Sequence, residues 1–549
     1  MVDILLIQPP IRDFYLTAKR TIPYGLTSIA ASLIREGFTV EILDGLATTR
    51  SRIIDTPAEL RYLNEYYGEV DKSPFALFHH YRHFGYSFEH LANLAGKSGA
   101  FLVGISSLFT PYAREAMTIA ECVKKSLPDS KIVLGGHHPS IIPESVMAWK
   151  AVDYVLRGDG EVSLPFLAQA IKKGSTLEAV PGIVFRKQDG SIQISAPAYV
   201  KNPDRLPLPA VHLLKHLYYR RGTKGSVVVA ATRGCPMACS YCCLRKSIYR
   251  KRRVRSIIDE IETAVANFNA GFIDFEDENL SLDRQWFLNL LNGLAERYAG
   301  DGPELRAMNG LYPPSLDEEI ICAMIKAGFK ALNLSLCSIS KDHLRRFQRS
   351  DVTAAFDDAL DWTEKYGLEA VGYVIAGGPF QSAEDSVSDL LFLARKRVLA
   401  GLSIYYPAPG SPDYELCRSM GILPNPFSLM RSSALPLSHT TSRTDSATLL
   451  RLTRILNFMK SLLDRGQKIP DPAPINGAAK INYEDKIEAG RQLLQWFLYD
   501  GRIRGVKPNG EVFSHKISGR LTKLFIGGLK QIRLRGVKSA KASPLQNIP

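Results

Sequence analysis

The sequence predicts an α/β protein in which two successive arrays of strands and helices are followed by a mostly helical C-terminal region. Two observations indicate the arrays. Short apolar runs that end at Pro, Gly or small polar residues recur over residues 2–156, and six more strand-like runs alternate with helical patterns from Ser226 onward. A third observation separates them, because residues 197–209 form a Pro-rich connector. Alternation of this kind is typical of parallel sheets.

The first array is expected to form an open, doubly wound sheet. Its strands are predicted at residues 2–8, 39–43, 101–106, 131–134 and 153–156, with helices at 26–36 and 112–126. Ligands of such sheets bind beyond the carboxyl ends of the strands. Residues 50–98, which are rich in aromatic residues and histidine, are predicted to be an insertion that forms either surface helices or a helical lid.

The second array is expected to curl into a partial (β/α)6 barrel. Its strands are predicted to begin near Ser226, Phe272, Leu305, Ala331, Ala370 and Leu402, with helices at 254–267, 283–298, 315–327, 341–347, 354–366 and 383–399. Active sites of such barrels lie at the carboxyl ends of the strands. Polar residues and glycines follow most of these strands, which places the predicted site at this end.

A cysteine-rich loop follows the first strand of this second array. Cys235, Cys239 and Cys242 have the spacing C-x3-C-x2-C, and soft thiolates of this kind select zinc or iron–sulfur clusters. A structural zinc site needs four ligands, and the adjacent side chain of Cys243 is expected to point away from that of Cys242. Three ligands with one vacancy favour a cluster with an open iron, and a zinc knuckle is the alternative.

The cysteine loop, with Tyr241 before its third cysteine, resembles the signature of radical SAM enzymes. The resemblance implies that the three cysteines hold a [4Fe–4S] cluster, whose open iron binds S-adenosylmethionine (SAM) and cleaves it to a 5′-deoxyadenosyl radical. Relatives often carry a glutamate near Ser338, where this chain has Cys337. The resemblance implies SAM-side contacts at Tyr241, Glu276, Asp277, Asn309, Ser335, Ser338, Gly377 and Tyr405.

The segments Leu5–Pro10, Val133–Ser140 and Tyr154–Glu161 resemble the Rossmann-like cobalamin-binding domain that precedes many radical SAM domains. The chain lacks the Asp-x-His-x-x-Gly motif, so no histidine ligand to cobalt is expected. His137 and His138 are the candidate substitutes, although surface or hydrogen-bonding roles are favoured for both. A scaffold that has lost cobalamin is the alternative. The implied cobalamin-side residues are Gln8, Pro9, Ser106, Ser107, Gly135, Gly136, His137, Gly158 and Glu161.

The net charge of +14 is concentrated near the C-terminus, where eleven Lys and Arg residues follow Gly501 against the single acid Glu511. This basic tail is expected either to touch an anionic membrane or to be loosely ordered, and nucleic acid is not an expected partner. The basic stretch Arg245–Arg255 is interpreted either as a contact for an anionic group or as a solvated face. The chain has no expected signal peptide or membrane-spanning run, which favours a cytoplasmic protein, with the inner membrane face as a peripheral location.

These observations predict five segments and one leading function. The segments are a B12-binding domain (1–196), a linker (197–215), a radical SAM barrel (216–424), a helical accessory domain (425–512) and a basic tail (513–549). The predicted activity is cobalamin-dependent methyl transfer to an unactivated carbon of a small molecule. The identity of that substrate is left open, with an apolar metabolite slightly favoured. A flavodoxin or ferredoxin is the expected reductant. The alternatives are a radical SAM cyclase or rearrangement enzyme, and a membrane- or RNA-associated adaptor with a degenerate core.

Overall fold

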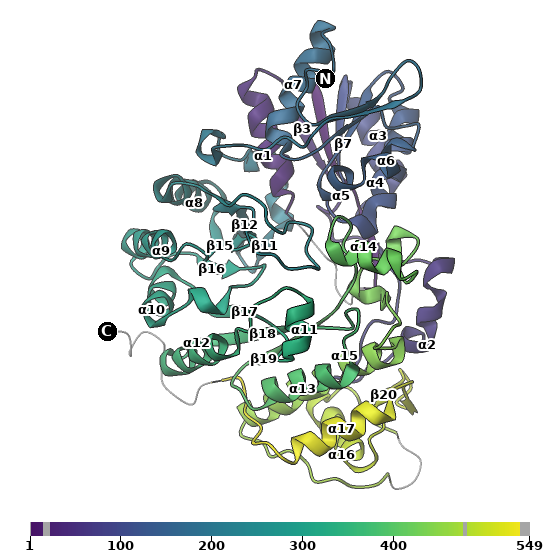
Figure 1. The fold of residues 1–549 in the computed structure, drawn as a ribbon, viewed down its shortest axis with the longest axis vertical. Coiled ribbons are helices and arrows are strands. Elements are labelled where there is room, and N and C mark those ends of the chain that lie inside the picture. The colour runs from purple at the N-terminus through teal and green to yellow at the C-terminus, as the bar shows by residue number, and fades with distance from the viewer. Residues whose placement is uncertain (1, 15–21, 476–479, 539–549) are drawn as a thin grey trace.

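The computed structural model describes residues 2–14, 22–475 and 480–538, which form three regions along one elongated molecule (Figure 1). An N-terminal α/β domain lies at one end, a partial barrel in the middle, and a group of C-terminal helices at the opposite end. This arrangement confirms the predicted α/β fold. The five predicted segment boundaries stay predictions.

The N-terminal domain is built on a seven-stranded sheet in the order β10-β9-β8-β7-β6-β1-β3. Five strands are parallel, and their order reverses between β1 and β6, which makes that point the switch point of a doubly wound sheet. The strands are β1 (Ile4–Gln8), β3 (Val40–Asp44), β6 (Leu102–Ser106), β7 (Lys131–Gly135), β8 (Tyr154–Leu156), β9 (Ile183–Arg186) and β10 (Ile192–Ile194). The last two are antiparallel additions.

Helices cover both faces of this sheet because its strands are apolar on both sides. Helices α1 (Tyr24–Arg35) and α7 (Gly160–Lys173) share one apolar core with one face. Helices α3 (Phe88–Ser98) and α4 (Ala113–Ser126) share another with the opposite face. Buried parallel strands of this kind need cover on both sides.

The barrel has six parallel strands in two groups. The first group is β12 (Lys224–Val229), β15 (Ala270–Phe275) and β16 (Glu304–Ala307), and the second is β17 (Ala331–Cys337), β18 (Glu369–Ala376) and β19 (Leu399–Ile404). Isolated bridges, Leu305 with Phe329 and Leu311 with Leu334, join β16 to the second group. The barrel helices are α8 (Val254–Phe268), α9 (Arg284–Tyr298), α10 (Glu318–Ala327), α11 (Lys341–Arg346), α12 (Thr353–Tyr366) and α13 (Ala383–Ala394). The predicted six-unit barrel is confirmed.

The edge of β19 is covered by a C-terminal helix, α15 (Arg443–Asp464). The side-chain amide of Asn457 on α15 both accepts from the backbone amide of Ala400 (2.9 Å) and donates to its carbonyl (2.8 Å). This pair of bonds replaces the missing neighbouring strand, because an open strand edge otherwise leaves unpaired backbone groups.

Residues 50–84 of the predicted insertion pack against the C-terminal region, whereas its last part, α3, covers the N-terminal sheet, so the insertion is neither a free lid nor simply a set of surface helices. It contains β4 (Ser51–Ile53), α2 (Asn64–Tyr67) and β5 (Arg82–Phe84), and β5 pairs with both β4 and β2 (Ile11–Asp13). The hydroxyl of Tyr62 donates to the carbonyl of Ala434, and the buried Arg451 donates to the carbonyls of Tyr66 and Phe75. The insertion therefore ties the first part of the chain to the last.

The C-terminal region continues with α16 (Lys486–Asp500), the hairpin β20 (Arg504–Val506) and β21 (Val512–Ser514), and α17 (Gly519–Leu529). Leu521 and Phe525 of α17 are fully buried in the core shared with α13 and α15. The expectation of a loosely ordered tail is thus wrong for residues 513–538, while residues 539–549 lie outside the described part of the chain. The apolar side of α17 faces the protein, which is why the amphipathic pattern misled the prediction.

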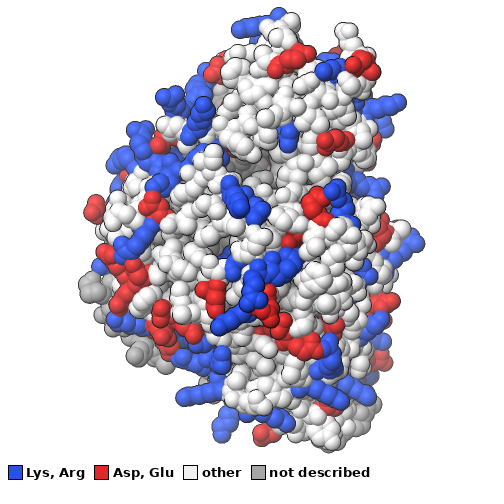
Figure 2. Space-filling model, in the orientation of Figure 1, with Lys and Arg blue, Asp and Glu red and all other residues white. Residues whose placement is uncertain are grey.

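Two further findings concern the distribution of charge on the surface and the hydropathy of the helices. On the face drawn in Figure 2, Lys and Arg side chains are interspersed with Asp and Glu from one end of the molecule to the other. Within residues 2–14, 22–475 and 480–538, no helix is both long enough and apolar enough to cross a bilayer.

Candidate active site

The cysteine loop is closed at its base by a short ribbon of two strands, β13 (Thr232–Arg233) and β14 (Arg250–Lys251). Gly234 follows β13 with φ +86°, and a Cβ there would lie 2.2 Å from the carbonyl oxygen of Ile248, so only glycine fits. Inside the loop, the amide of Ser247 donates to the carbonyl of Cys235 (3.0 Å), and the Ser247 hydroxyl accepts from the Cys235 amide (2.8 Å). These bonds fix the first cysteine before any metal binds.

Each of the three predicted ligand sulfurs faces an N–H donor. The side-chain amide of Asn279 lies 4.0 Å from the sulfur of Cys235, and a guanidinium nitrogen of Arg349 lies 3.6 Å from that of Cys239. The backbone amide of Leu244 lies 3.4 Å from the sulfur of Cys242. Hydrogen bonds to sulfur are one of the means by which proteins stabilise and tune iron–sulfur clusters, so this donor set fits the predicted cluster.

In the part of the chain that the structure describes, no group of three or more His, Cys, Asp or Glu side chains is arranged to hold a metal ion, the cysteine triad included. Burial raises the pKa of Cys235 and that of Cys242, the latter to about 12, so both thiols are protonated until a metal displaces the proton. Burial also raises the pKa of the half-buried Cys243, which follows the triad.

Arg349 joins the cysteine loop to the barrel. Besides facing Cys239, it donates to the Ser335 hydroxyl (2.9 Å) and carbonyl (3.2 Å) at the carboxyl end of β17, and to the Tyr241 hydroxyl (3.3 Å). The Tyr241 ring packs edge-on against Phe347, with centroids 4.8 Å apart. The sequence analysis identified Ser335 and Tyr241 but missed Arg349, because nothing in the local sequence distinguishes it from the other arginines near α11.

The acidic residues after β15 brace the cysteine loop. The Asp277 carboxylate accepts from the Thr232 hydroxyl (2.6 Å) and from the Ala231 amide (3.4 Å), and burial raises its pKa to about 7. The Glu278 carboxylate accepts from the Gly234 amide (3.0 Å). Asp277 therefore faces the loop backbone in this structure, and its predicted SAM contact stays a prediction.

Two predicted residues lie around this brace. Glu276 is exposed at the carboxyl end of β15, and the side-chain amide of Asn309 donates to the carbonyls of Glu276 (3.0 Å) and Asp277 (3.4 Å). Both therefore lie at the predicted end of the barrel, where Asn309 fixes the turn after β15. Their proposed contacts with SAM remain untested.

The three remaining SAM-side candidates are engaged in packing. The buried hydroxyl of Ser338 donates to Asp389 on α13 (3.0 Å). The Tyr405 ring stacks on Phe347 with centroids 5.9 Å apart, and its hydroxyl lies 3.4 Å from the Asp413 carboxylate. Gly377 directly follows β18 and has φ +79°. Their predicted SAM contacts stay predictions.

The predicted cobalamin-side residues gather at the switch point of the N-terminal sheet. Gln8 is the last residue of β1 and Pro9 follows it, while Ser106 is the last residue of the neighbouring β6 and Ser107 follows it. The hydroxyl of Ser107 is buried and has no hydrogen-bond partner among the described residues. An orphaned hydroxyl at this position fits a polar ligand in the crevice, because buried polar groups are otherwise hydrogen-bonded.

Glycines bring the neighbouring loops close to this crevice. Gly135 ends β7, and a Cβ on Gly136 (φ +118°) would lie 2.6 Å from the carbonyl oxygen of Ser107. A Cβ on Gly158 (φ +91°) would lie 2.0 Å from the carbonyl oxygen of Ala198. Both positions require glycine for close backbone approach, which is a structural role distinct from cofactor contact.

The two loop histidines differ. Both ring nitrogens of the buried His138 have partners, the hydroxyls of Thr110 (3.3 Å) and Ser145 (3.2 Å), and burial lowers its pKa to about 4. His137 is exposed, and the carboxylates of Glu278 and Asp159 interact electrostatically with its ring. The geometry therefore favours the hydrogen-bonding role predicted for His138, and the role of His137 stays a prediction.

The basic residues of the stretch Arg245–Arg255 are partly exposed, in line with a solvated face, and most of them also pair with acids of the protein itself. Ion pairs join Arg250 to Asp159, Lys251 to Asp283, Arg252 to Glu260, Arg253 to Asp204 and Arg255 to Asp259. Glu161, predicted on the cobalamin side, accepts from Arg233 at 2.6 Å. Sequence patterns could not reveal these pairs because most of the partners lie far apart in the chain.

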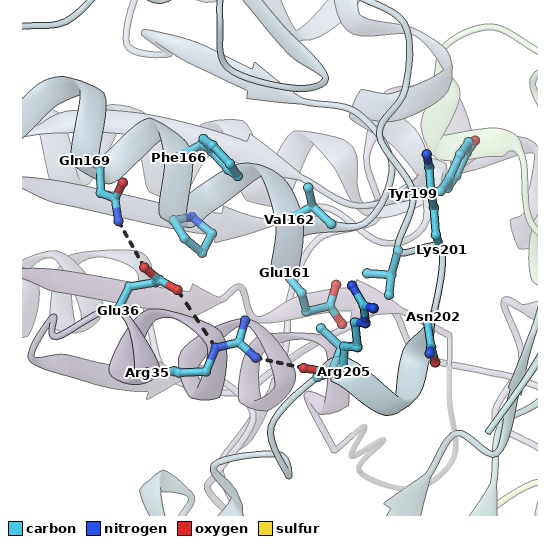
Figure 3. A pocket seen from close by; sticks show the side chains of 13 residues that line it. Arg35, Glu36, Glu161, Val162, Phe166, Gln169, Tyr199, Lys201, Asn202 and Arg205 are labelled. Carbon is cyan, nitrogen blue, oxygen red and sulfur yellow. Dashed lines mark hydrogen bonds and ion pairs between the residues drawn. The ribbon is translucent and has the colours of Figure 1, made fainter. Parts of the chain in front are cut away.

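A cavity of about 590 Å³ lies between α1, α7 and residues 199–206. Figure 3 shows Glu36 between Arg35 and Gln169, and Arg35 reaching the carbonyl of Arg205. Of the predicted cobalamin-side residues, only Glu161 lines it. The cavity is therefore distinct from the crevice at the switch point.

Two family models match the chain. Residues 77–168 match the B12 binding domain, and residues 229–393 match the radical SAM superfamily. This chain is a radical SAM enzyme with a B12-binding domain. Its cofactors are a [4Fe–4S] cluster, SAM and cobalamin, and the cysteine donor set and the orphaned Ser107 hydroxyl fit the cluster and cobalamin.

Curated relatives of this radical SAM enzyme include methyltransferases and cyclases. It is 24% identical to the uncharacterized methyltransferase PH0819 of Pyrococcus horikoshii, over 77% of this chain and 84% of that protein. It is 22% identical to cytidylyl-2-hydroxyethylphosphonate methyltransferase of Streptomyces wedmorensis, over 65% and 69%. It is 26% identical to the anaerobic magnesium-protoporphyrin IX monomethyl ester cyclase of Rubrivivax gelatinosus, over 57% of this chain and 58% of the cyclase.

Solved structures share the fold. The methyltransferase TsrM from Kitasatospora setae, with cobalamin and a [4Fe–4S] cluster bound, has a TM-score of 0.58 at 19% identity and covers 77% of this chain and 76% of its own. The cobalamin-dependent radical enzyme OxsB, with aqua-cobalamin and SAM bound, has a TM-score of 0.62 at 14% identity, over 90% and 72%. At these identities the likeness establishes the fold of this radical SAM enzyme.

Proposed function

We propose that this radical SAM enzyme transfers a methyl group to an unactivated carbon of a small molecule. The observation that carries the proposal is the joining of two sites in one chain, a cysteine triad with an N–H donor at each sulfur and a B12-binding crevice with an orphaned hydroxyl. The methyltransferases among its relatives support the same reaction.

In this proposal, Cys235, Cys239 and Cys242 hold the cluster, and Ser107 binds a polar group of cobalamin. When bound, the cluster and SAM supply the one-electron chemistry that generates a hydrogen-abstracting radical, and cobalamin supplies a carrier for the methyl group. The protein positions the cofactors and the substrate and excludes water from them.

The residues around the triad do this positioning work. Asn279 and Arg349 donate toward sulfur, while Asp277 and Glu278 hold the first residues of the loop. Phe347 is fully buried and contacts the rings of both Tyr241 and Tyr405, so an apolar wall borders the loop. Such a wall keeps bulk water away from a reactive radical.

A cyclase is the second candidate, because cyclases are also among the relatives. The two reactions consume SAM differently. Methyl transfer with turnover yields both S-adenosylhomocysteine and 5′-deoxyadenosine, whereas radical cyclisation yields 5′-deoxyadenosine without S-adenosylhomocysteine.

We also propose a flavodoxin or ferredoxin as the reductant. The amphipathic pattern that suggested a membrane contact is explained by the packing of α17 into the protein core.

The test is anaerobic incubation of the reconstituted protein with SAM carrying a deuterated methyl group, a low-potential reductant and a fractionated pool of small metabolites. We expect both SAM products and a metabolite that gains the deuterated methyl group. 5′-Deoxyadenosine alone, with a metabolite changed in mass but free of deuterium, would favour the cyclase.

A further inference from the structure

The loop that carries the cysteines is tied to the B12-binding domain by a group of four charged residues. Arg233 ends β13 and Arg250 begins β14, and these two arginines are paired opposite one another in the ribbon that closes the cysteine loop. Asp159 and Glu161 lie where β8 leads into α7 in the N-terminal domain. We call Asp159, Glu161, Arg233 and Arg250 the interdomain clamp.

The contacts of the clamp are short and largely removed from water. Arg233 lies 2.6 Å from Glu161 and 3.4 Å from Asp159, and Arg250 lies 2.8 Å from Asp159. The four side chains are 5–18% exposed. Arg250 also donates to the carbonyl of Val200 (2.6 Å), and the backbone amide of Val200 donates to Asp159 (2.8 Å).

This geometry is that of a positioning device. A buried ion pair adds little net stability compared with apolar packing, but removing one partner strands a charge and is costly, so such a pair enforces one arrangement. Here the enforced arrangement is that of the cysteine loop against the B12-binding domain. Arg233 lies two residues before Cys235, so a displacement of the arginine moves the first ligand.

We infer that Asp159 and Glu161 are positioning residues that hold the cysteine loop in register with the B12-binding domain through Arg233 and Arg250. Neither acid needs to contact a reacting atom for this role. The inference rests on the proposed function for its consequence, a fixed spacing between the two cofactor sites, which direct methyl transfer requires. The contacts themselves are independent of which reaction the enzyme performs.

The chain offers a matched control on the same segment. Arg252, two residues beyond Arg250, forms an equally buried ion pair with Glu260, and both partners belong to the barrel. Within the described residues, Glu260 forms its ion pair with Arg252 alone, so Glu260→Gln removes a buried charge next to β14 and leaves the ion pairs of the clamp in place. Asp159→Asn and Glu161→Gln remove the clamp acids with almost no change in side-chain volume.

The experiment is hydrogen–deuterium exchange on the full chain without cofactors or substrate. We expect Glu161→Gln, Asp159→Asn and Arg233→Gln each to raise amide exchange in residues 234–249 by about 10-fold or more, with α12 unchanged. Glu260→Gln should leave exchange in residues 234–249 close to that of the unmodified protein. Combining Glu161→Gln with Arg233→Gln should add little to either single change, because both break the same pair.

Two outcomes would overturn the inference: loop exchange that stays unchanged in the clamp variants, or that rises equally in Glu260→Gln. Thermal melting identifies any variant that fails to fold, because exchange then rises throughout the chain. Asp159→Glu, which keeps the charge, is measured in place of such a variant, and its loop must be as protected as that of the unmodified protein. Because no cofactor is present, the result is separate from that of the methyl-transfer test.

Discussion

Replacing Arg349 with Gln should lower the reduction potential of the cluster. The guanidinium lies 3.6 Å from the Cys239 sulfur and is held there by Ser335 and Tyr241. Reduction adds a negative charge to the cluster, and a nearby cation stabilises that charge. A hydrogen bond to a charged group contributes about 1.5–3 kcal/mol, which for one electron corresponds to about 60–130 mV.

The assay is a redox titration followed by electron paramagnetic resonance, on protein whose iron content has been matched. Arg345→Gln is the control, because it removes the same charge from nearby α11, where Arg345 is 78% exposed and pairs with the exposed Asp342. Solvent screens that charge, so its removal should change the potential far less. Arg349→Lys should give an intermediate shift. Equal potentials in the Arg349→Gln and Arg345→Gln proteins would refute the reasoning.

Three further predictions concern the ligands, the B12 crevice and acid stability. Cys242→Ser should abolish cluster assembly, whereas Cys243→Ser should retain it, as measured by iron content. A comparable loss of iron in both variants would show that the proposed ligand set is wrong. Ser107→Ala should weaken cobalamin binding about 5-fold by losing one hydrogen bond, measured by absorbance titration, with Ser163→Ala, another buried orphaned hydroxyl, leaving affinity unchanged. Burial lowers the pKa of His138 from 6.5 to about 4, so the unfolded chain binds more protons between these values. Acidification from pH 6.5 to 4 should therefore cost about 3 kcal/mol of unfolding free energy, and a His138→Gln protein that melts with the same pH dependence would contradict this.

The sequence predicted those features of the structure that depend on local patterns of residues. The six barrel strands and the five parallel strands follow from alternation of apolar runs and turn residues, and the cysteine triad follows from its spacing. Contacts between distant segments were beyond reach. Arg349 and Cys239 are 110 residues apart, and Arg233 and Glu161 are 72 apart, so only the folded chain brings each pair together.

One error and one incomplete interpretation share this cause. The helix α17 was expected in a loosely ordered or membrane-bound tail because its apolar side had no visible partner, yet α13 and α15 provide one. The stretch Arg245–Arg255 was expected to meet solvent or an anionic ligand; part of it is exposed, and acids from other segments, which the sequence could not identify, pair with much of it. An amphipathic or charged segment shows which side needs a partner, and the tertiary fold decides what that partner is.

The most direct test of the account is to reconstitute the purified chain anaerobically and to measure iron, sulfide, zinc and corrinoid on the same sample. The account predicts about four irons and sulfides and about one corrinoid per chain, because the triad and the switch-point crevice are separate sites in one molecule. Stoichiometric zinc in place of iron, or an iron-loaded chain that binds no corrinoid, would contradict it.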